Sequence, residues 1–271
     1  MITFCGNRFI IRINQLIVTL ITDFGYTDPY VGSMKGVMLG INPDVQIVDI
    51  THDVTPQNID EAAFILKRSY SFFPEGTMHV IVVDPGVGST RSIIGVKTDS
   101  ALFLAPDNGV LKYIFYHHSV KVYQITNQDY FRDHVSHTFH GRDIFAPIAA
   151  HMSRGITLDI LGQPSENYIK GELSNPVVEA EHISGEITYI DRFGNGITNI
   201  GGNLVTGLKK MQIHIKTTTV KKLSNRYIDV PLGEPLALIG SGNTLEISVH
   251  QGNAAQQIGF RVGDPITVSF E

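Results

Sequence analysis

The chain has 271 residues, of which 42% are hydrophobic and 17% charged, a composition typical of a folded globular protein rather than a disordered one. Its formal net charge of -5, without a run of basic residues, argues against nucleic acid or a membrane surface as a partner. The single cysteine, Cys5, excludes internal disulfides and cysteine-rich zinc sites and fits the reducing cytoplasm, where we expect the protein to act.

We interpret residues 1–14 as an extension that precedes the first domain. Arg8, Arg12 and Asn14 interrupt its apolar stretches, so the segment is too short and too polar to span a membrane. No small-residue cleavage site follows it, and a signal peptide is therefore not expected.

From residue 16 onward, apolar β-branched runs alternate with helical patterns. Asp28 is expected to cap the first helix, with Pro29 in its first turn, and Asn58 with Glu61 resembles a capping box at the start of the second helix. The expected strands are 16–21, 45–50, 78–83, 93–97, 102–105 and 120–125. The expected helices are 28–41, 58–73, 110–116 and 142–152. This alternation predicts an α/β domain over residues 15–165 with a largely parallel central sheet.

Polar residues follow three of the predicted strands. Asp23, the pair His52 and Asp53, and Asp84 each lie at or just beyond a carboxyl end. Ligands of parallel sheets bind at this edge, so we expect these residues to converge on one site.

The pattern changes after residue 165. Residues 166–180 show no periodicity and are predicted to be a linker. Residues 181–271 contain short strands, much glycine and little helical pattern, which predicts a small antiparallel β-barrel-like domain. The strands are expected at 185–190, 211–216, 236–239, 245–249 and 265–270.

The most specific stretch is Asp84-Pro85-Gly86-Val87-Gly88-Ser89-Thr90-Arg91. Its glycines and proline predict a tight loop that can fold Arg91 back toward Asp84 and let a ligand approach the backbone. It lacks the Gly-Lys-Ser/Thr ending of a nucleotide P-loop. Taken alone, such a loop is more often a surface turn with an incidental salt bridge.

Other candidate residues are equally ambiguous when taken singly. His140 precedes Gly141 and a predicted helix start, a position from which side chains reach clefts, yet most histidines are packing or surface residues. The nearby histidines do not follow a zinc-binding spacing. Asp28 is a helix cap first and a ligand contact second. The loops around Asp191 and Ser241 have the composition of ordinary hairpin turns.

The order of the motifs is far more specific than any one of them. The chain contains, in this order, LITDFG, DITHDV, VDPGVG, APDNG, TFHGRDIFAP, DRFGN and QGNAA. Together they closely resemble the S-adenosyl-L-methionine hydroxide adenosyltransferases, the hydrolytic relatives of fluorinase and chlorinase. The resemblance extends from about Leu16 to the C-terminus.

The resemblance implies an enzyme that hydrolyses S-adenosyl-L-methionine to adenosine and L-methionine, without a metal or another cofactor. It assigns the catalytic roles to Asp84, Arg91 and His140, and the ribose hydroxyls to Asp23. It also implies a homotrimer whose sites lie between subunits. The further substrate contacts implied are Asp28 and Phe139, Asp191, Asn195 and Ser241 for methionine, and Asn253 and Ala254 for adenine.

Two positions distinguish hydrolysis from halogenation. The halogenating relatives have a tyrosine in place of Asp84 and a serine in place of Gly141. A carboxylate repels a halide but accepts a hydrogen bond from water, so Asp84 favours hydrolysis. A halogenase remains one alternative, which formation of a 5′-chloro nucleoside in chloride would identify.

Two other classes of protein also stay open. Asp23, His52, Asp53, Asp84 and His140 could instead be ligands of a metal-dependent hydrolase, which a chelator would inactivate. A non-catalytic protein that only binds adenosyl compounds would bind S-adenosyl-L-methionine without releasing adenosine.

Overall fold

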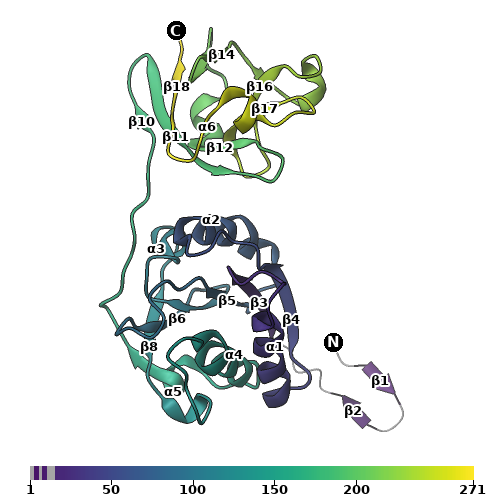
Figure 1. Cartoon of the computed structure of the whole chain (residues 1–271), viewed down its shortest axis with the longest axis vertical. Coiled ribbons are helices and arrows are strands. Elements are labelled where there is room, and N and C mark those ends of the chain that lie inside the picture. Colours follow the sequence, from purple (N-terminus) through teal and green to yellow (C-terminus); the bar gives the residue numbers. More distant parts are fainter. Residues whose placement is uncertain (1–2, 6–7, 11–15) are drawn as a thin grey trace. The chain divides into compact units, whose positions relative to one another are not determined.

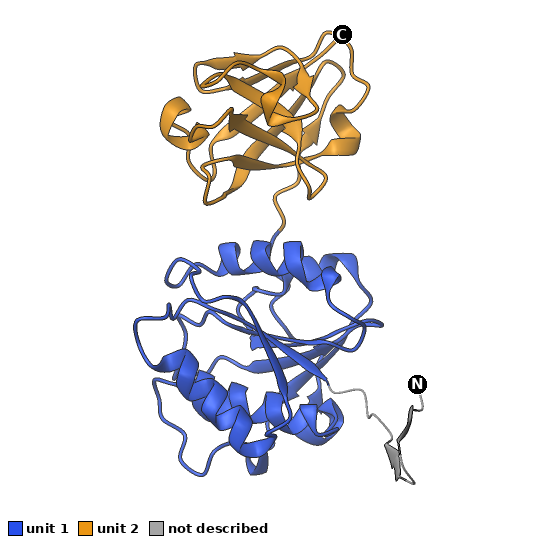
Figure 2. Cartoon of the chain, turned by 90° about the vertical axis from the view of Figure 1, so that its right-hand side faces the viewer, with its two compact units in different colours: residues 1–172 blue, residues 173–271 orange. Residues whose placement is uncertain are grey.

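The computed structural model of the chain describes residues 3–5, 8–10 and 16–271. The chain forms two compact units, Met1–Glu172 and Leu173–Glu271 (Figure 2), and the division falls inside the segment 166–180. Strands β1 (Thr3–Cys5) and β2 (Arg8–Ile10) pair antiparallel with each other. The rest of the extension predicted at residues 1–14 lies outside the described residues.

Unit 1 is built around a seven-stranded sheet in the order β4-β3-β5-β7-β6-β8-β9. Strands β4, β3, β5 and β7 pair in parallel, whereas β6, β8 and β9 join antiparallel at one edge. The α/β class with a largely parallel centre is therefore confirmed. The strands are Ile17–Thr22 (β3), Gln46–Thr51 (β4), Met78–Val82 (β5), Ile93–Lys97 (β6), Leu102–Pro106 (β7), Lys121–Ile125 (β8) and Gly162–Pro164 (β9).

Helices cover both faces of this sheet (Figure 1). Along β3, Val18 and Leu20 pack with α1 and α4 on one face, and Ile21 packs with α2 and α3 on the other. Among the described residues, no helix is long and apolar enough to cross a membrane. The helices are α1 (Tyr30–Ile41), α2 (Ile59–Ser69), α3 (Lys112–His117), α4 (Ala146–Ser153) and α5 (Leu158–Leu161), with 3-10 turns at Tyr70–Phe72 and Gln128–Tyr130.

The two predicted helix starts have different outcomes. The Asn58 side chain accepts a hydrogen bond of 3.0 Å from the Glu61 N–H, so the predicted cap of α2 is confirmed. The prediction that Asp28 caps α1 is wrong, because the helix begins one residue later, at Tyr30. Pro29 occupies the cap position there, and its ring offers no acceptor for the first N–H groups.

Unit 2 is a nine-stranded, mostly antiparallel sheet around its own apolar core. Only β15 and β16 pair in parallel. The glycine-rich strand β12 was not expected from the sequence. The strands are Val177–Val178 (β10), His182–Ile190 (β11), Gly196–Gly201 (β12), Gln212–Ile215 (β13), Thr218–Val220 (β14), Leu223–Ser224 (β15), Pro235–Ile239 (β16), Thr244–Val249 (β17) and Pro265–Ser269 (β18). The helices are α6 (Gly202–Val205), a 3-10 turn at Tyr227–Asp229 and α7 (Ala254–Ile258).

Unit 1 contains a buried histidine, His79, whose lowered pKa makes the stability of the fold depend on pH. His79 on β5 is 1% exposed, and its Nδ1 lies 2.8 Å from Thr19 Oγ1 on β3. The rings of Tyr70, Phe73 and Phe103 surround it. Burial lowers the pKa of His79 from 6.5 to about 4, so the folded protein holds this side chain neutral.

We expect His79 to make the protein less stable in acid. The unfolded chain takes up the proton below pH 6.5, whereas the folded chain resists it down to about pH 4. The contribution of His79 is therefore complete above pH 6.5 and is lost as the pH falls toward 4. Between pH 7 and pH 5 this loss amounts to about 2 kcal/mol of unfolding free energy.

The measurement is urea unfolding of the wild type and of His79→Phe at both pH values, followed by circular dichroism. Phenylalanine fits the aromatic surroundings and does not titrate, although it leaves the Thr19 hydroxyl without this partner at either pH. The variant should lose about 2 kcal/mol less than the wild type on acidification. Equal losses in the two proteins would assign the acid sensitivity to other groups.

Candidate active site

The three residues predicted to be catalytic come from three segments that end at one edge of the sheet. Asp84 follows β5, and Arg91 precedes β6 by two residues. His140 immediately precedes a π-helical turn, Gly141–Phe145, that leads into α4. The Ala146 N–H donates to the Gly141 carbonyl oxygen five residues earlier, and this bond defines the wider turn.

Two successive turns fold the loop between β5 and β6 back on itself. The Val87 N–H donates to the Asp84 carbonyl oxygen at 3.2 Å, and the Ser89 N–H donates to the Gly86 carbonyl oxygen at 3.1 Å. Arg91 thereby returns to Asp84, as the glycines and proline led us to expect. Its Nε donates to Asp84 Oδ1 at 2.8 Å, and its Nη2 donates to Asp84 Oδ2. The two side chains are only 11% and 6% exposed, so this ion pair is largely removed from water.

Arg91 also reaches His140. Its Nη2 lies 2.9 Å from His140 Nδ1, and because a guanidinium has only donors, Nδ1 is the acceptor. A neutral His140 therefore carries its proton on Nε2. Burial, followed by the charge of Arg91, lowers the pKa of His140 below the ordinary value of 6.5, whereas Asp84 and Asp143 oppose this shift. The structure thus favours the neutral imidazole near pH 7.

A close backbone approach joins the Asp84 loop to the loop that holds His140. Gly88 has φ of +79°, and a Cβ at this position would lie 2.3 Å from the His137 carbonyl oxygen. Glycine meets both requirements, because it adopts positive φ freely and has no side chain to clash.

Asp143 holds the loop before His140 in place by a hydrogen bond to its backbone. Its side chain is fully buried, and its Oδ2 accepts a hydrogen bond of 3.0 Å from the Ser136 N–H. The Arg142 guanidinium donates to both carboxylate oxygens, at 2.7 and 3.0 Å, and Arg132 Nη1 lies 3.3 Å from Oδ1. Although desolvation opposes ionisation, these donors together lower the pKa of Asp143 to about 2. Sequence reasoning passed over this residue, although its place in the TFHGRDIFAP motif was a signal.

Asp23, the predicted ribose ligand, lies just beyond β3. Its Oδ2 accepts a hydrogen bond of 2.8 Å from the backbone N–H of Gln57, which has the unusual φ of +67°. His52 does not join Asp23 and Asp84 in an open cluster, because it is fully buried and its Nδ1 lies 2.7 Å from Thr22 Oγ1. In the described part of the chain, no group of three His, Cys, Asp or Glu side chains could hold a metal ion.

Phe139 belongs to an aromatic cluster next to His140. Its ring contacts Phe24 and Tyr30 edge-on, with centroids 5.8 and 5.1 Å away, and the Arg142 guanidinium lies 5.1 Å from its centroid. Gly141 is packed tightly in this cluster, because a Cβ there would come within about 3.3 Å of three side chains. Asp28 lies on the exposed surface before α1.

In unit 2, Asp191 and Asn195 bind each other. Asp191 Oδ1 accepts from the Asn195 N–H and Oδ2 from the Asn195 Nδ2, both at 2.9 Å. Asn253 caps α7 and packs against Gly194, which belongs to the loop of Asp191 and Asn195. The methyl group of Ala254 lies in the core of unit 2. Ser241 is exposed in the turn before β17. The predicted methionine and adenine segments around Asp191 and Asn253 are therefore neighbours.

A buried carboxylate near Asp191 was missed by sequence reasoning. Glu246 on β17 is 7% exposed, and its Oε1 accepts hydrogen bonds from the Tyr227 hydroxyl at 2.8 Å and the Ser248 hydroxyl at 2.9 Å. Burial raises the pKa of Tyr227 to about 12, with further contributions from Glu246 and Asp191. Glu246 occupies an alternating strand pattern, which gives no signal of this cluster.

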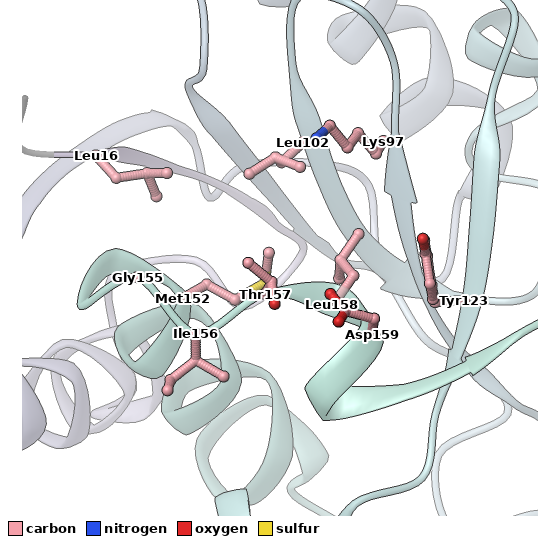
Figure 3. Close-up of a pocket in the computed structure, with 10 residues that line it drawn as sticks. All are labelled: Leu16, Lys97, Leu102, Tyr123, Met152, Gly155, Ile156, Thr157, Leu158 and Asp159. Carbon is pink, nitrogen blue, oxygen red and sulfur yellow. The ribbon is translucent and has the colours of Figure 1, made fainter.

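A cavity of about 270 Å³ lies in unit 1 at the amino ends of the parallel strands, opposite to the carboxyl ends that hold the candidate site (Figure 3). Leu16 and Leu102, at the amino ends of β3 and β7, line it together with Met152. Because β3, β5 and β7 run parallel, this edge is the one away from Asp84. The cavity is therefore separate from the candidate site.

Two family models match the chain. The SAM hydroxide adenosyltransferase N-terminal domain matches residues 18–162, and the C-terminal domain of the same name matches residues 185–267. An (R)-S-adenosyl-L-methionine hydrolase from Methanocaldococcus jannaschii is 35% identical over 94% of this chain and 96% of its own length. A fluorinase from Actinoplanes sp. is 27% identical over 93% and 97%. The crystal structure of an uncharacterized conserved protein from Thermotoga maritima has a TM-score of 0.88 and 37% identity, covering 93% of this chain and 100% of that one.

We expect the Gly88 contact to be sensitive to a single methyl group. Gly88→Ala combines the cost of positive φ, about 1–2 kcal/mol, with displacement of the His137 carbonyl oxygen. Gly76→Ala is the matched control, because Gly76 has φ of +82° but open space around its Cα. The unfolding free energy of Gly88→Ala should fall below that of Gly76→Ala by at least about 1 kcal/mol, measured by urea unfolding. Equal losses in the two variants would mean that the contact between the loops contributes nothing.

Proposed function

The chain belongs to the SAM hydroxide adenosyltransferase family, and we propose that it hydrolyses S-adenosyl-L-methionine to adenosine and L-methionine. The observation that carries this proposal is the hydrogen-bonded trio of Asp84, Arg91 and His140, with a carboxylate where the resemblance places a tyrosine in halogenating enzymes. The hydrolase relative supports the same reaction.

The reaction requires a water oxygen to attack the ribose 5′ carbon in line with the carbon–sulfur bond. The bond electrons move to sulfur, which leaves as the neutral thioether of methionine, and one proton is released from the water. Because a sulfonium is already a good leaving group, orientation of the water is the main task, and good alignment contributes several kcal/mol. No Lewis acid is needed for this step, and we propose that the substrate is the only small molecule required.

Asp84 is the group that we propose orients the water and accepts its proton. His140 is the less suitable acceptor, because its Nδ1 lone pair already receives a hydrogen bond from Arg91. The Nε2–H of the neutral imidazole can instead donate to the oxygen of the attacking water. Arg91 acts by donating hydrogen bonds to the carboxylate and to the imidazole, which holds both side chains in place.

The remaining residues are proposed to bind the rest of the substrate. Asp23 retains Oδ1 for the ribose hydroxyls while Gln57 holds its Oδ2. Asp28 and Phe139 are further candidate contacts in unit 1. In unit 2, we propose Asp191, Asn195 and Ser241 for the methionine part and Asn253 and Ala254 for the adenine. These roles follow from the resemblance and are supported by the proximity of Asp191, Asn195 and Asn253.

We propose further that the enzyme is a homotrimer with sites shared between subunits, and that it acts in the cytoplasm. The first proposal rests on the family resemblance and on the assignment of substrate contacts to both compact units. The second is supported by the low cysteine content of the chain.

Product analysis tests the proposed reaction. The protein is incubated with S-adenosyl-L-methionine in EDTA without halide, and chromatography should show adenosine and L-methionine in equal amounts. Asp84→Asn should lower kcat by about 100-fold or more, because amide nitrogen does not accept the proton. Asp99→Asn, which changes an exposed aspartate between β6 and β7, should retain full activity.

Other outcomes would identify the alternatives. Loss of turnover in EDTA would indicate a metal-dependent hydrolase, and 5′-chloro-5′-deoxyadenosine formed in chloride would indicate a halogenase. Binding without adenosine release would indicate a sensor, and near-normal turnover by Asp84→Asn would contradict the role of Asp84. Because the name of the hydrolase relative specifies the R form, the two sulfur epimers are supplied separately, and we expect preference for R.

The pH profile tests the neutral state of His140. Since the pKa of His140 lies below 6.5, kcat/KM should stay level from pH 8 to about 6.5 and fall at lower pH. Protonation at Nδ1 breaks the bond from Arg91 and adds a positive charge beside it. His140→Asn keeps an acceptor at the same position but does not titrate, so this acid limb should flatten. An unchanged acid limb in the variant would mean that another group controls it.

A further inference from the structure

The loop between β5 and β6 crosses over the end of another strand. In the sheet, β7 lies between β5 and β6. The loop leaves β5 after Val82 and enters β6 at Ile93, so it forms an arch above the carboxyl end of β7. Val83 and Ser92, next to these two strands, are the supports of the arch. Asp84 and Arg91 are the first and last residues between these two supports.

The residues that follow β7 contact both supports of the arch. The Asp107 N–H donates to the Ser92 carbonyl oxygen at 2.9 Å, which continues the β6–β7 ladder by one step. On the other side, Asn108 Nδ2 donates to the Val83 carbonyl oxygen at 3.0 Å. The arch is thus held at Val83 by a side chain and at Ser92 by the backbone.

The bond from Asn108 matters because of where the neighbouring backbone ladder ends. Strands β5 and β7 are in register from Met78 with Leu102 to Val80 with Leu104. Val83 lies three residues beyond this register, and Asp84 follows it directly. The Asn108 amide is therefore the hydrogen bond that holds the backbone of Val83 to the segment after β7, in addition to the apolar packing of the Val83 side chain.

Asn108 is itself fixed in place. Its Oδ1 accepts a hydrogen bond of 3.2 Å from the Val110 N–H, which closes a turn before α3. The neighbouring Asp107 carboxylate accepts a hydrogen bond of 2.8 Å from the Ile169 N–H. Both arms of the Asn108 amide are used, so its donor can point in one direction only.

We propose that Asn108 is a positioning residue for the reaction, which holds the Asp84–Arg91 pair in the orientation that the attacking water requires. This inference rests on the proposed hydrolysis. Asn108 need not touch the substrate, because it acts on Asp84 through the Val83 carbonyl group. Small displacements of an aligned group reduce the rate strongly, so the loss should appear in kcat rather than in KM.

The chain contains a matched control. Asn127 makes the same pair of bonds elsewhere in unit 1: its Nδ2 donates to the Ile160 carbonyl oxygen at 3.0 Å, and its Oδ1 accepts from the Asp129 N–H at 3.2 Å. Asn127→Ala therefore removes the same interactions as Asn108→Ala, but without a connection to the arch. Comparing the two variants therefore distinguishes a loss of positioning at Asp84 from the general effect of losing an asparagine side chain in a turn.

The first measurement is steady-state hydrolysis of S-adenosyl-L-methionine. Asn108→Ala should lower kcat about 10-fold or more with KM within about two-fold of the wild type, because a misplacement near 1 Å costs up to 100-fold. Asn127→Ala should leave both constants within about two-fold. A second pair, Asn108→Asp and Asn127→Asp, keeps the Oδ1 acceptor and the turn while removing the donor, so it serves if the alanine variant folds poorly.

The second measurement is amide hydrogen exchange, which does not depend on the substrate. Residues 84–91 should exchange faster in both Asn108 variants and at the wild-type rate in both Asn127 variants. Unchanged exchange in the arch, unchanged kcat, or an equal loss of kcat in the Asn127 variants would overturn the proposal. If the wild type does not hydrolyse S-adenosyl-L-methionine, the proposed function fails. Hydrogen exchange then still tests whether Asn108 holds the arch, and a wild-type exchange rate in the Asn108 variants would show that it does not.

Discussion

The candidate site depends on the hydrogen bonds that the Arg91 guanidinium donates to Asp84 and His140. One side chain donates to both oxygens of Asp84 and to Nδ1 of His140, so a single planar group sets the orientation of a carboxylate and the tautomer of an imidazole. Lysine could supply the charge but not this fixed fork of donors. Since the pair is largely removed from water, neither Asp84 nor Arg91 can leave the other without stranding a buried charge.

The surrounding structure serves to hold this guanidinium and its two partners in place. The Asp84 loop is tied to the sheet at both ends, and Gly88 brings it against the backbone at His137. Asp143 holds the other loop through the Ser136 N–H and two arginines. The Gly88 contact joins segments about fifty residues apart in the chain. The bonds at Ser92, Val83 and Ser136 each use a backbone group, which a change of rotamer cannot move. Rigid support of this kind is what positions a reactive group to within a fraction of an ångström.

Much of the fold could be predicted because its signals are local. Continuous apolar runs indicated the strands of unit 1, and Asn58 with Glu61 located the start of α2 to the residue. The return of Arg91 to Asp84 followed from two glycines and a proline within eight residues. Asp28 failed as a cap because Asp-Pro offers two possible start positions and sequence does not choose between them. Strand β12 was missed because its two glycines resemble a turn.

The parts of the candidate site that depend on contacts between distant segments could not be predicted from the sequence. The burial of Asp143, the aromatic surroundings of His79 and the cluster around Glu246 arise only when several elements pack together. Nothing local to Asn108 indicates that its amide will meet the carbonyl of Val83, 25 residues earlier. The substrate contacts assigned in unit 2 remain predictions from the ordered motifs.

The arch over β7 also sets how its two ends meet. Because β7 separates β5 from β6, the backbone must cover two inter-strand spacings, roughly 10 Å, between Val83 and Ser92. Eight extended residues could cover more than twice this distance, so the two tight turns between Asp84 and Arg91 take up the excess length and bring Arg91 back to Asp84. A substitution at position 84 leaves the path of the arch unchanged, whereas an inserted or deleted residue would alter the two turns that return Arg91 to position 84. The spacing of seven positions between Asp84 and Arg91 is therefore the feature of the arch on which their ion pair depends, because the two turns are built on that spacing.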